Sequence, residues 1–209
     1  MGGNVTLAGL QVFVGAYTRL TGGSLMSLLT HTELVELVQQ DIITNVRLDQ
    51  INAASIDVTL GNTVWIEDNP NGQYTVVDLA EKETPHMTMV SLLSTGYYDL
   101  PPGGFCLAGT RETFNLPDDL AAEYKLKSSL ARAGLDAALA MWCDPGWHGS
   151  VLTLELTNVL KMHSLRLRPG MKIGQMIFHR GTPVPAHASY AVRGSYNGDQ
   201  AATPSKGVK

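Results

Sequence analysis

The first regular pattern of polar and apolar positions starts at Thr30 and predicts a helix. The four residues from Thr30 to Glu33 have the form of a capping box, in which Thr30 is the N-cap and Glu33 reaches back to it. The apolar positions that follow share one helical face: Leu34, Val35, Leu37 and Val38. The pattern therefore predicts a short amphipathic helix near the start of the ordered chain.

After this helix the apolar residues come in short runs that are typical of strands. Residues 151–157 alternate cleanly, so that three leucines face one way while Thr153 and Glu155 face the other. Further strands are predicted at residues 56–60, 64–66, 74–79, 87–93, 105–108 and 171–178. Turns are predicted at residues 61–62, 69–72 and 169–170, and a short helical turn at 116–120. Short strands with Gly and Pro turns predict a mainly β fold, a barrel or a jelly roll.

The two ends of the chain lack this periodicity. Residues 1–25 contain one charged side chain, Arg19, and lack the basic start and unbroken apolar run of a signal peptide. They are also too polar for a membrane span, so we expect an N-terminal extension or leader. Residues 189–209 are rich in Gly, Ser, Asn and Ala and are expected to form a flexible tail. One domain, residues 26–188, lies between them.

Composition narrows the classes of function. Only 16% of the 209 residues are charged and the net charge is −4, which disfavours a disordered chain, a coiled coil or a protein that binds polymeric nucleic acid. A small phosphorylated ligand at a local site stays compatible. The two cysteines, Cys106 and Cys143, form no CxxC pair, and this fits a reducing compartment.

One apparent motif is rejected. Residues 31–33 match the H-x-E half of the zinc-dependent nucleoside deaminases, but the P-C-x-x-C half is missing from the sequence. The capping box explains these residues better. A dinucleotide-binding glycine fingerprint and a P-loop are absent from the sequence as well.

The most informative segment is residues 127–135, KSSLARAGL, which places two hydroxyls between two cations. This composition suits anionic oxygens, although a solvated basic turn has the same composition. One further segment precedes it, 51–61 (INAASIDVTLG). Three follow it along the chain: 144–149 (DPGWHG), 151–158 (VLTLELTN) and 168–175 (RPGMKIGQ). Together with the tail at 196–206, they resemble the dCTP deaminase branch of the dUTPase superfamily over about residues 26–206.

The resemblance implies a distorted β-barrel of the dUTPase-like type, assembled as a homotrimer with active sites shared between subunits. It implies cytoplasmic, zinc-independent deamination of dCTP to dUTP and ammonia, with Mg²⁺ bound through the substrate triphosphate. Glu155 matches the catalytic glutamate, which moves protons between water, the ring and the leaving ammonia. A carboxylate suits this role where no metal acidifies the water, whereas on pattern alone Glu155 is an ordinary strand residue.

The remaining site residues are assigned by the same resemblance. Ser128 and Arg132 match residues that hold the attacking water and the glutamate, and Asp144 matches the aspartate that contacts the deoxyribose and helps exclude a 2′-hydroxyl. The residues expected to contact the triphosphate, the base or other parts of the nucleotide are Lys127, Ser129, Leu130, Ala131, Thr153, Leu154, Gln175 and Tyr190.

Several positions depart from the family pattern. Residues 140–143 replace a T-A-x-x-I type stretch near the base, within a rebuilt loop at 136–143. Ser195 stands where Lys is usual and Asp199 where Gln is usual, changes that should weaken triphosphate binding. Three alternatives to the deaminase therefore stay open: a bifunctional enzyme that also cleaves dUTP to dUMP, a plain dUTP diphosphatase, and a catalytically silent nucleotide-binding trimer. Inhibition by dTTP is left open.

Overall fold

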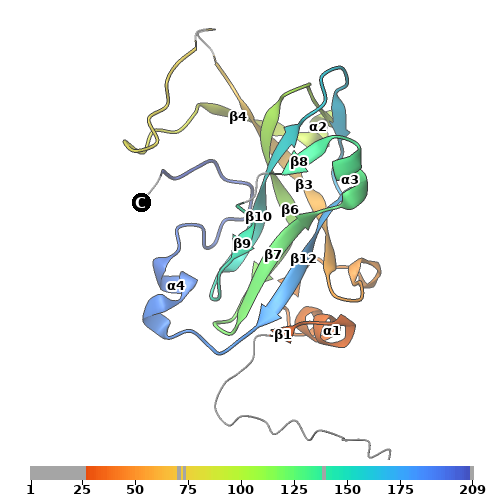
Figure 1. Cartoon of the computed structure of the whole chain (residues 1–209), viewed down its shortest axis with the longest axis vertical. Helices are drawn as coiled ribbons and strands as arrows, with labels where there is room; N and C mark the ends of the chain where they lie inside the picture. The colour runs from red at the N-terminus through yellow and green to blue at the C-terminus, as the bar shows by residue number, and fades with distance from the viewer. Residues whose placement is uncertain (1–26, 70–71, 73, 138–139, 208–209) are drawn as a thin grey trace, which may run out of the picture.

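The computed structural model describes residues 27–69, 72, 74–137 and 140–207 (Figure 1). The predicted extension at residues 1–25 lies outside the described part of the chain. The helices are α1 (His31–Gln39), α2 (Leu92–Thr95), α3 (Ser128–Arg132), α4 (Tyr190–Arg193) and the 3₁₀ helices η1 (Leu48–Gln50) and η2 (Ala186–Ala188). The strands are β1 (Ser27–Leu28), β2 (Ile43–Thr44), β3 (Ile56–Glu67), β4 (Met87–Ser91), β5 (Tyr98–Leu100), β6 (Phe105–Asn115), β7 (Leu120–Leu126), β8 (Leu135–Ala137), β9 (Trp142–Cys143), β10 (His148–Asn158), β11 (Leu165–Leu167) and β12 (Lys172–Arg180).

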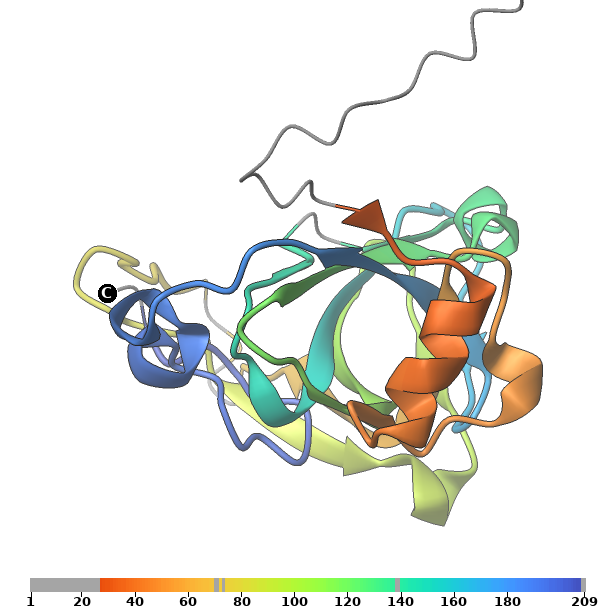
Figure 2. The same ribbon diagram turned by 90° about the horizontal axis from the view of Figure 1, so that it is seen from below.

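Ten of the described strands form a curled sheet with the central order β8-β10-β6-β3-β12-β7-β9, and β5 and β11 form a separate two-stranded sheet. β3 joins the two halves, because its first part pairs with β12 and its second part pairs with β6 and β4. Seen from below, the sheet curls around a common interior and α1 lies across one end of it (Figure 2). The predicted distorted β-barrel with a short N-terminal helix is confirmed, whereas the trimer stays a prediction.

The N-terminal helix forms as its sequence pattern predicts. The Thr30 backbone N–H donates to the Glu33 carboxylate at 2.9 Å, which completes the capping box. Leu34 and Leu37 are buried on the face that meets the barrel. The largest fully buried side chains of the core are Leu29, Leu34, Leu37, Ile43, Ile56, Leu60, Leu92, Leu100, Phe114, Leu120, Leu154 and Phe178.

The turn predicted at residues 61–62 is wrong, because β3 runs through it without a break from Ile56 to Glu67. Gly61 is required there by close packing and not by a turn: a Cβ at this position would lie 2.9 Å from the Gly109 carbonyl oxygen of β6. The pairing of β3 with β6 also shifts register between Leu60 and Val64. A glycine inside a strand pattern therefore marks a bulge with close backbone approach.

Two other predicted elements are absent from the described residues, and several strands have different bounds. Residues 74–79 form no strand, and three of their large apolar side chains are exposed: Tyr74, Val76 and Leu79. Residues 116–120 form a tight turn and no helix, because Leu120 already begins the pairing of β7 with β12. The strand predicted at 105–108 extends to Asn115, and the one at 87–93 ends at Ser91, where α2 begins.

No helix among the described residues is both long enough and apolar enough to cross a bilayer.

Candidate functional site

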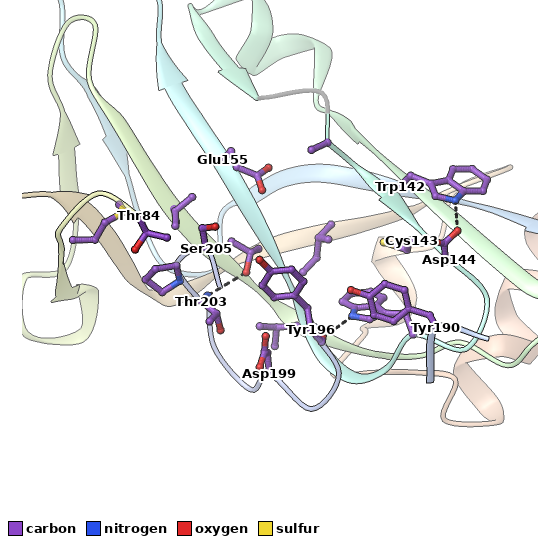
Figure 3. A pocket seen from close by; sticks show the side chains of 18 of the residues that line it. Thr84, Trp142, Cys143, Asp144, Glu155, Tyr190, Tyr196, Asp199, Thr203 and Ser205 are labelled. Carbon is purple, nitrogen blue, oxygen red and sulfur yellow. Dashed lines mark hydrogen bonds between the residues drawn. The ribbon is translucent and has the colours of Figure 1, made fainter. Parts of the chain in front are cut away.

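A pocket of about 490 Å³ opens beside β10, which is a volume typical of small-molecule sites (Figure 3). Its walls come from β10, β9, the start of β6, the segment before β4 and the C-terminal tail. The lining residues are Thr84, Pro85, Met87, Phe105, Leu107, Ala140, Trp142, Cys143, Asp144, Trp147, Val151, Leu152, Thr153, Glu155, Tyr190, Tyr196, Asp199, Thr203, Pro204 and Ser205.

β10 directs Glu155 into this pocket by simple alternation. Leu154 and Leu156 are fully buried in the core, and Thr153 and Glu155 are half-buried on the opposite face. The Glu155 Oε2 atom is buried and has no hydrogen-bond partner among the described residues. Burial raises the pKa of the Glu155 carboxyl above its ordinary value. A carboxylate in this setting is a stronger base than an exposed one and suits proton transfer.

The C-terminal tail forms one wall of the pocket. The Val151 N–H donates to the Asp199 carbonyl at 2.9 Å, and the Thr203 N–H donates to the Thr153 hydroxyl at 3.2 Å. The Trp65 indole N–H donates to the carbonyl of the buried Ala202 at 2.7 Å. Residues 189–207 therefore lie against the barrel in this structure, and the predicted flexibility of the tail stays a prediction.

The pocket contains carboxylates without matching cations. Asp144, Glu155 and Asp199 line it, and no Lys, Arg or His is found among its described lining residues. Asp199 binds the Lys206 ammonium at 2.9 Å, just outside the lining. Because phosphates need positive charge or N–H donors, this pocket by itself is a poor site for a triphosphate.

The predicted phosphate-binding segment lies elsewhere, on α3. Ser128, Ser129 and Arg132 are exposed there, and none of the residues from Lys127 to Arg132 lines the pocket. In Figure 1, α3 lies on the side of the barrel away from α4 and the tail. The structure of one chain therefore separates the predicted cationic segment from the predicted catalytic glutamate.

Lys127 and Gln175 belong to a polar cluster at the base of α3. The buried Asp57 carboxylate binds the Lys127 ammonium at 2.8 Å and the Lys172 ammonium at 3.0 Å. Ser55 donates to the Gln175 side-chain oxygen at 3.2 Å. Burial by itself would raise the pKa of Asp57, but hydrogen bonds from Lys127 and other neighbours outweigh it and hold that pKa below its ordinary value. Asp57 thus anchors the lysine that precedes α3.

The structure brings together four of the predicted site residues in the pocket: Asp144, Thr153, Glu155 and Tyr190. It does not bring Gln175 or residues 127–132 to them. The Leu154 side chain is fully buried, so any contact with a base would use its backbone. Sequence reasoning missed the pocket walls at residues 84–87, because that segment has no periodic pattern and its position depends on the fold.

The described residues offer little support for a metal or thiol site. They contain no group of three or more His, Cys, Asp and Glu side chains that could hold a metal ion. Cys106 and Cys143 are buried, and burial raises the pKa of each thiol to about 12. Thiols with such pKa values are poor nucleophiles.

Sequence comparisons connect the chain with known enzymes. The model of a family described as dCTP deaminase-like matches residues 28–181. A dCTP deaminase, dUMP-forming, of Rhodococcus opacus is 38% identical over 159 residues, covering 75% of this chain and 82% of that protein. The protein of the same description from Acidothermus cellulolyticus is 41% identical over 160 residues, covering 75% of this chain and 81% of that protein.

A solved structure is similar in fold. The 2′-deoxycytidine 5′-triphosphate deaminase of Agrobacterium tumefaciens superposes with a TM-score of 0.56 and 20% sequence identity. The alignment covers 75% of this chain and 48% of that chain, so the present protein spans about half of that solved one. This likeness concerns the fold alone.

The Asp57 cluster generates a prediction about stability. Asp57→Asn leaves Lys127 and Lys172 facing each other without a counter-charge, so we expect a loss of roughly 1–3 kcal/mol at pH 7. Removing one partner of a fully buried ion pair lowers the free energy of unfolding by more than this. The smaller value is expected here because both lysines are partly exposed. Urea unfolding of wild type and variant between pH 7 and pH 3 measures the difference.

The pH dependence gives the sharper readout. A carboxyl whose pKa is lower in the folded than in the unfolded state stabilises the fold above its unfolded pKa of about 3.9 and loses this effect as the pH falls through its folded pKa. The gap between wild type and Asp57→Asn should therefore shrink below about pH 4. Asp49→Asn is the control, because Asp49 contacts Lys172 at 3.9 Å but is exposed. A gap that does not change with pH contradicts the role of Asp57.

Proposed function

Because the chain belongs to the dCTP deaminase-like family, we propose that it converts dCTP to dUMP by deamination followed by cleavage of the triphosphate. The family membership rests on the match over residues 28–181 and on relatives that are about two-fifths identical. The observation that carries the proposal is Glu155, a half-buried carboxylate with a raised pKa that faces a pocket of nucleotide size. The names of the relatives, which include dUMP formation, favour this bifunctional reaction over release of dUTP.

The first step needs a base and later an acid at the same place. Glu155 takes a proton from water as the hydroxide adds to C4 of the cytosine, and it delivers that proton to N3. The carboxylate then takes the proton of the new C4 hydroxyl and passes it to the amino group, so that the C4–N bond breaks, the C4 carbonyl forms and ammonia leaves to give dUTP. The raised pKa suits both halves of this cycle, because the carboxyl changes its protonation state more readily near neutral pH.

The second step is hydrolysis of dUTP by water, which breaks the bond between the α-phosphorus and its bridging oxygen and gives dUMP and pyrophosphate. It needs cations around the phosphates, and Mg²⁺ would enter bound to the substrate triphosphate. The pocket lining lacks basic side chains among its described residues, so the positive charge has to come from outside it.

We propose that this charge comes from α3 of a neighbouring copy in a homotrimer. The α3 helix exposes hydrogen-bond donors and a positive charge on Ser128, Ser129 and Arg132. None of these three residues lines the pocket of its own chain. Glu155 Oε2, which has no partner among the described residues, would gain one in the assembled site. The separation of the two half-sites within one chain supports the shared arrangement.

The product distinguishes the reactions. Purified protein incubated with dCTP and Mg²⁺ should release ammonia and accumulate dUMP and pyrophosphate. Chromatographic separation of the nucleotides checks this. Accumulation of dUTP instead would reduce the proposal to a plain deaminase, and absence of any turnover of dCTP or dUTP would favour a nucleotide-binding trimer without activity.

Glu155→Gln should lower the rate of ammonia release by about 10²–10⁴-fold while dCTP binding, measured by calorimetry, is kept. In the wild type, the base must be ionised, so the rate should fall as the pH drops through a pKa above the ordinary glutamate value. Thr157→Ser, a change on the same face of β10 but outside the pocket lining, is the control for altered strand packing. An unchanged rate in Glu155→Gln refutes the assigned role.

Mixed trimers test the shared site. Glu155→Gln and Arg132→Ala chains should each be inactive, yet unfolding and refolding them together should restore activity in roughly a quarter of the sites. Those sites combine an intact Glu155 from one chain with an intact Arg132 from another. Each variant mixed with the double variant Glu155→Gln/Arg132→Ala is the control, because such mixtures contain no intact pair. If the first mixture stays as inactive as the controls, the shared site is wrong.

A further inference from the structure

Trp142 is a large aromatic residue at the pocket edge that the proposed reaction does not yet use. It lies on the two-residue strand β9, where it pairs in register with Glu123 of β7. Its side chain is 54% exposed, although it lines the pocket. One face of the indole stacks on His179, with ring centroids 6.2 Å apart and an interplanar angle of 28°. The ring is therefore held by the sheet while its edge stays available to the site.

That edge is directed at Asp144. The indole Nε1–H of Trp142 donates to the Asp144 Oδ1 atom at 2.8 Å (Figure 3). An indole N–H is a donor only, and a carboxylate is an acceptor, so the contact has one possible direction. Within the described part of the chain, no hydrogen bond reaches the second oxygen, Oδ2. The pair thus fixes an exposed carboxylate in one orientation with one acceptor atom occupied.

The occupied atom matters for the kind of sugar that the carboxylate can accept. The two oxygens of a freely rotating carboxylate can accept hydrogen bonds from both neighbouring hydroxyls of a ribose. The Trp142 hydrogen bond takes one lone pair of Oδ1 and holds the carboxylate plane, so the carboxylate cannot turn both oxygens toward a ribose without breaking that bond, whereas Oδ2 can accept from the one ring hydroxyl of a 2′-deoxyribose. The second hydroxyl of a ribose would then be buried without a partner, which is costly.

We propose that Trp142 is a positioning residue that sets the preference for deoxyribonucleotides over ribonucleotides, by occupying Oδ1 of Asp144. The inference rests on the proposed function, in which Asp144 contacts the sugar of the nucleotide. Trp142 makes no contact with the reacting atoms in this scheme. Its effect is transmitted entirely through the carboxylate that it holds.

The test is Trp142→Phe, which keeps an aromatic ring over His179 and removes the N–H. We expect the ratio of kcat/KM for dCTP to that for CTP to fall about tenfold, chiefly because CTP improves once Oδ1 is released. Thr88→Val is the matched control: it also removes a hydrogen bond to an aspartate, the one to Asp68, and neither of these residues lines the pocket. The ratio should be unchanged in that variant.

A double-mutant cycle separates the positioning role from a general change in packing. In the Asp144→Ala background, Trp142→Phe should have no further effect on the dCTP/CTP ratio, because the residue acts through Asp144. Equal effects of Trp142→Phe in both backgrounds, or an unchanged ratio in the wild-type background, overturn the inference. Thermal unfolding of each variant confirms that the exposed substitution leaves the fold intact.

Binding measurements keep this result distinct from the proposed reaction. Calorimetric titrations with dCTP and with CTP give two dissociation constants. The ratio of these constants reports the preference for the deoxyribonucleotide without requiring turnover. If the protein binds dCTP selectively but does not turn it over, the proposed reaction is wrong. The effect of Trp142→Phe on the ratio of dissociation constants still tests the inference about Trp142. A wild-type protein that binds neither nucleotide, or that binds both equally, overturns the inference about Trp142.

Discussion

The alternation along β10 is the constraint on which the candidate site depends. One face of this strand supplies fully buried leucines that anchor it in the barrel, and the other presents Thr153 and Glu155 to the pocket. The same strand pairs with β6 and β8 and receives the C-terminal tail through Val151 and Thr153. Because its register is set by core packing, a slip of one residue would exchange the leucines with the side chains that face the pocket.

The distribution of charge is the second organising feature. The pocket gathers carboxylates, while the exposed Arg132 and the paired Lys127 lie on or beside α3. The two signs of charge therefore lie on separate parts of one chain. In the homotrimer that we propose, α3 of a neighbouring copy would bring its positive charge to the pocket around a polyanionic nucleotide.

Carboxylates at the pocket and at the base of α3 are held by specific partners. Asp57 is buried but bound by two lysines, and Asp144 is exposed but oriented by the Trp142 indole. Asp199, the acidic departure in the tail, is bound by Lys206, which offsets the negative charge that it adds beside the pocket. In each case an ion pair or a hydrogen bond restricts the rotation of the carboxylate, which is the usual requirement for a preorganised site.

The sequence by itself determined the β class, the N-terminal helix and the face of β10 that bears Glu155, because alternation and capping are local properties of consecutive residues. Its collinear motifs also determined the family. Only the tertiary structure decided that Gly61 lies inside a strand, that residues 74–79 form none, and that the tail and residues 84–87 form pocket walls. The motifs suggested a single site made of residues 127–132 and Glu155, whereas the fold separates them on one chain. Such features depend on contacts between segments far apart in the chain, and no local pattern records which backbone will approach a given glycine or which segments will line a pocket.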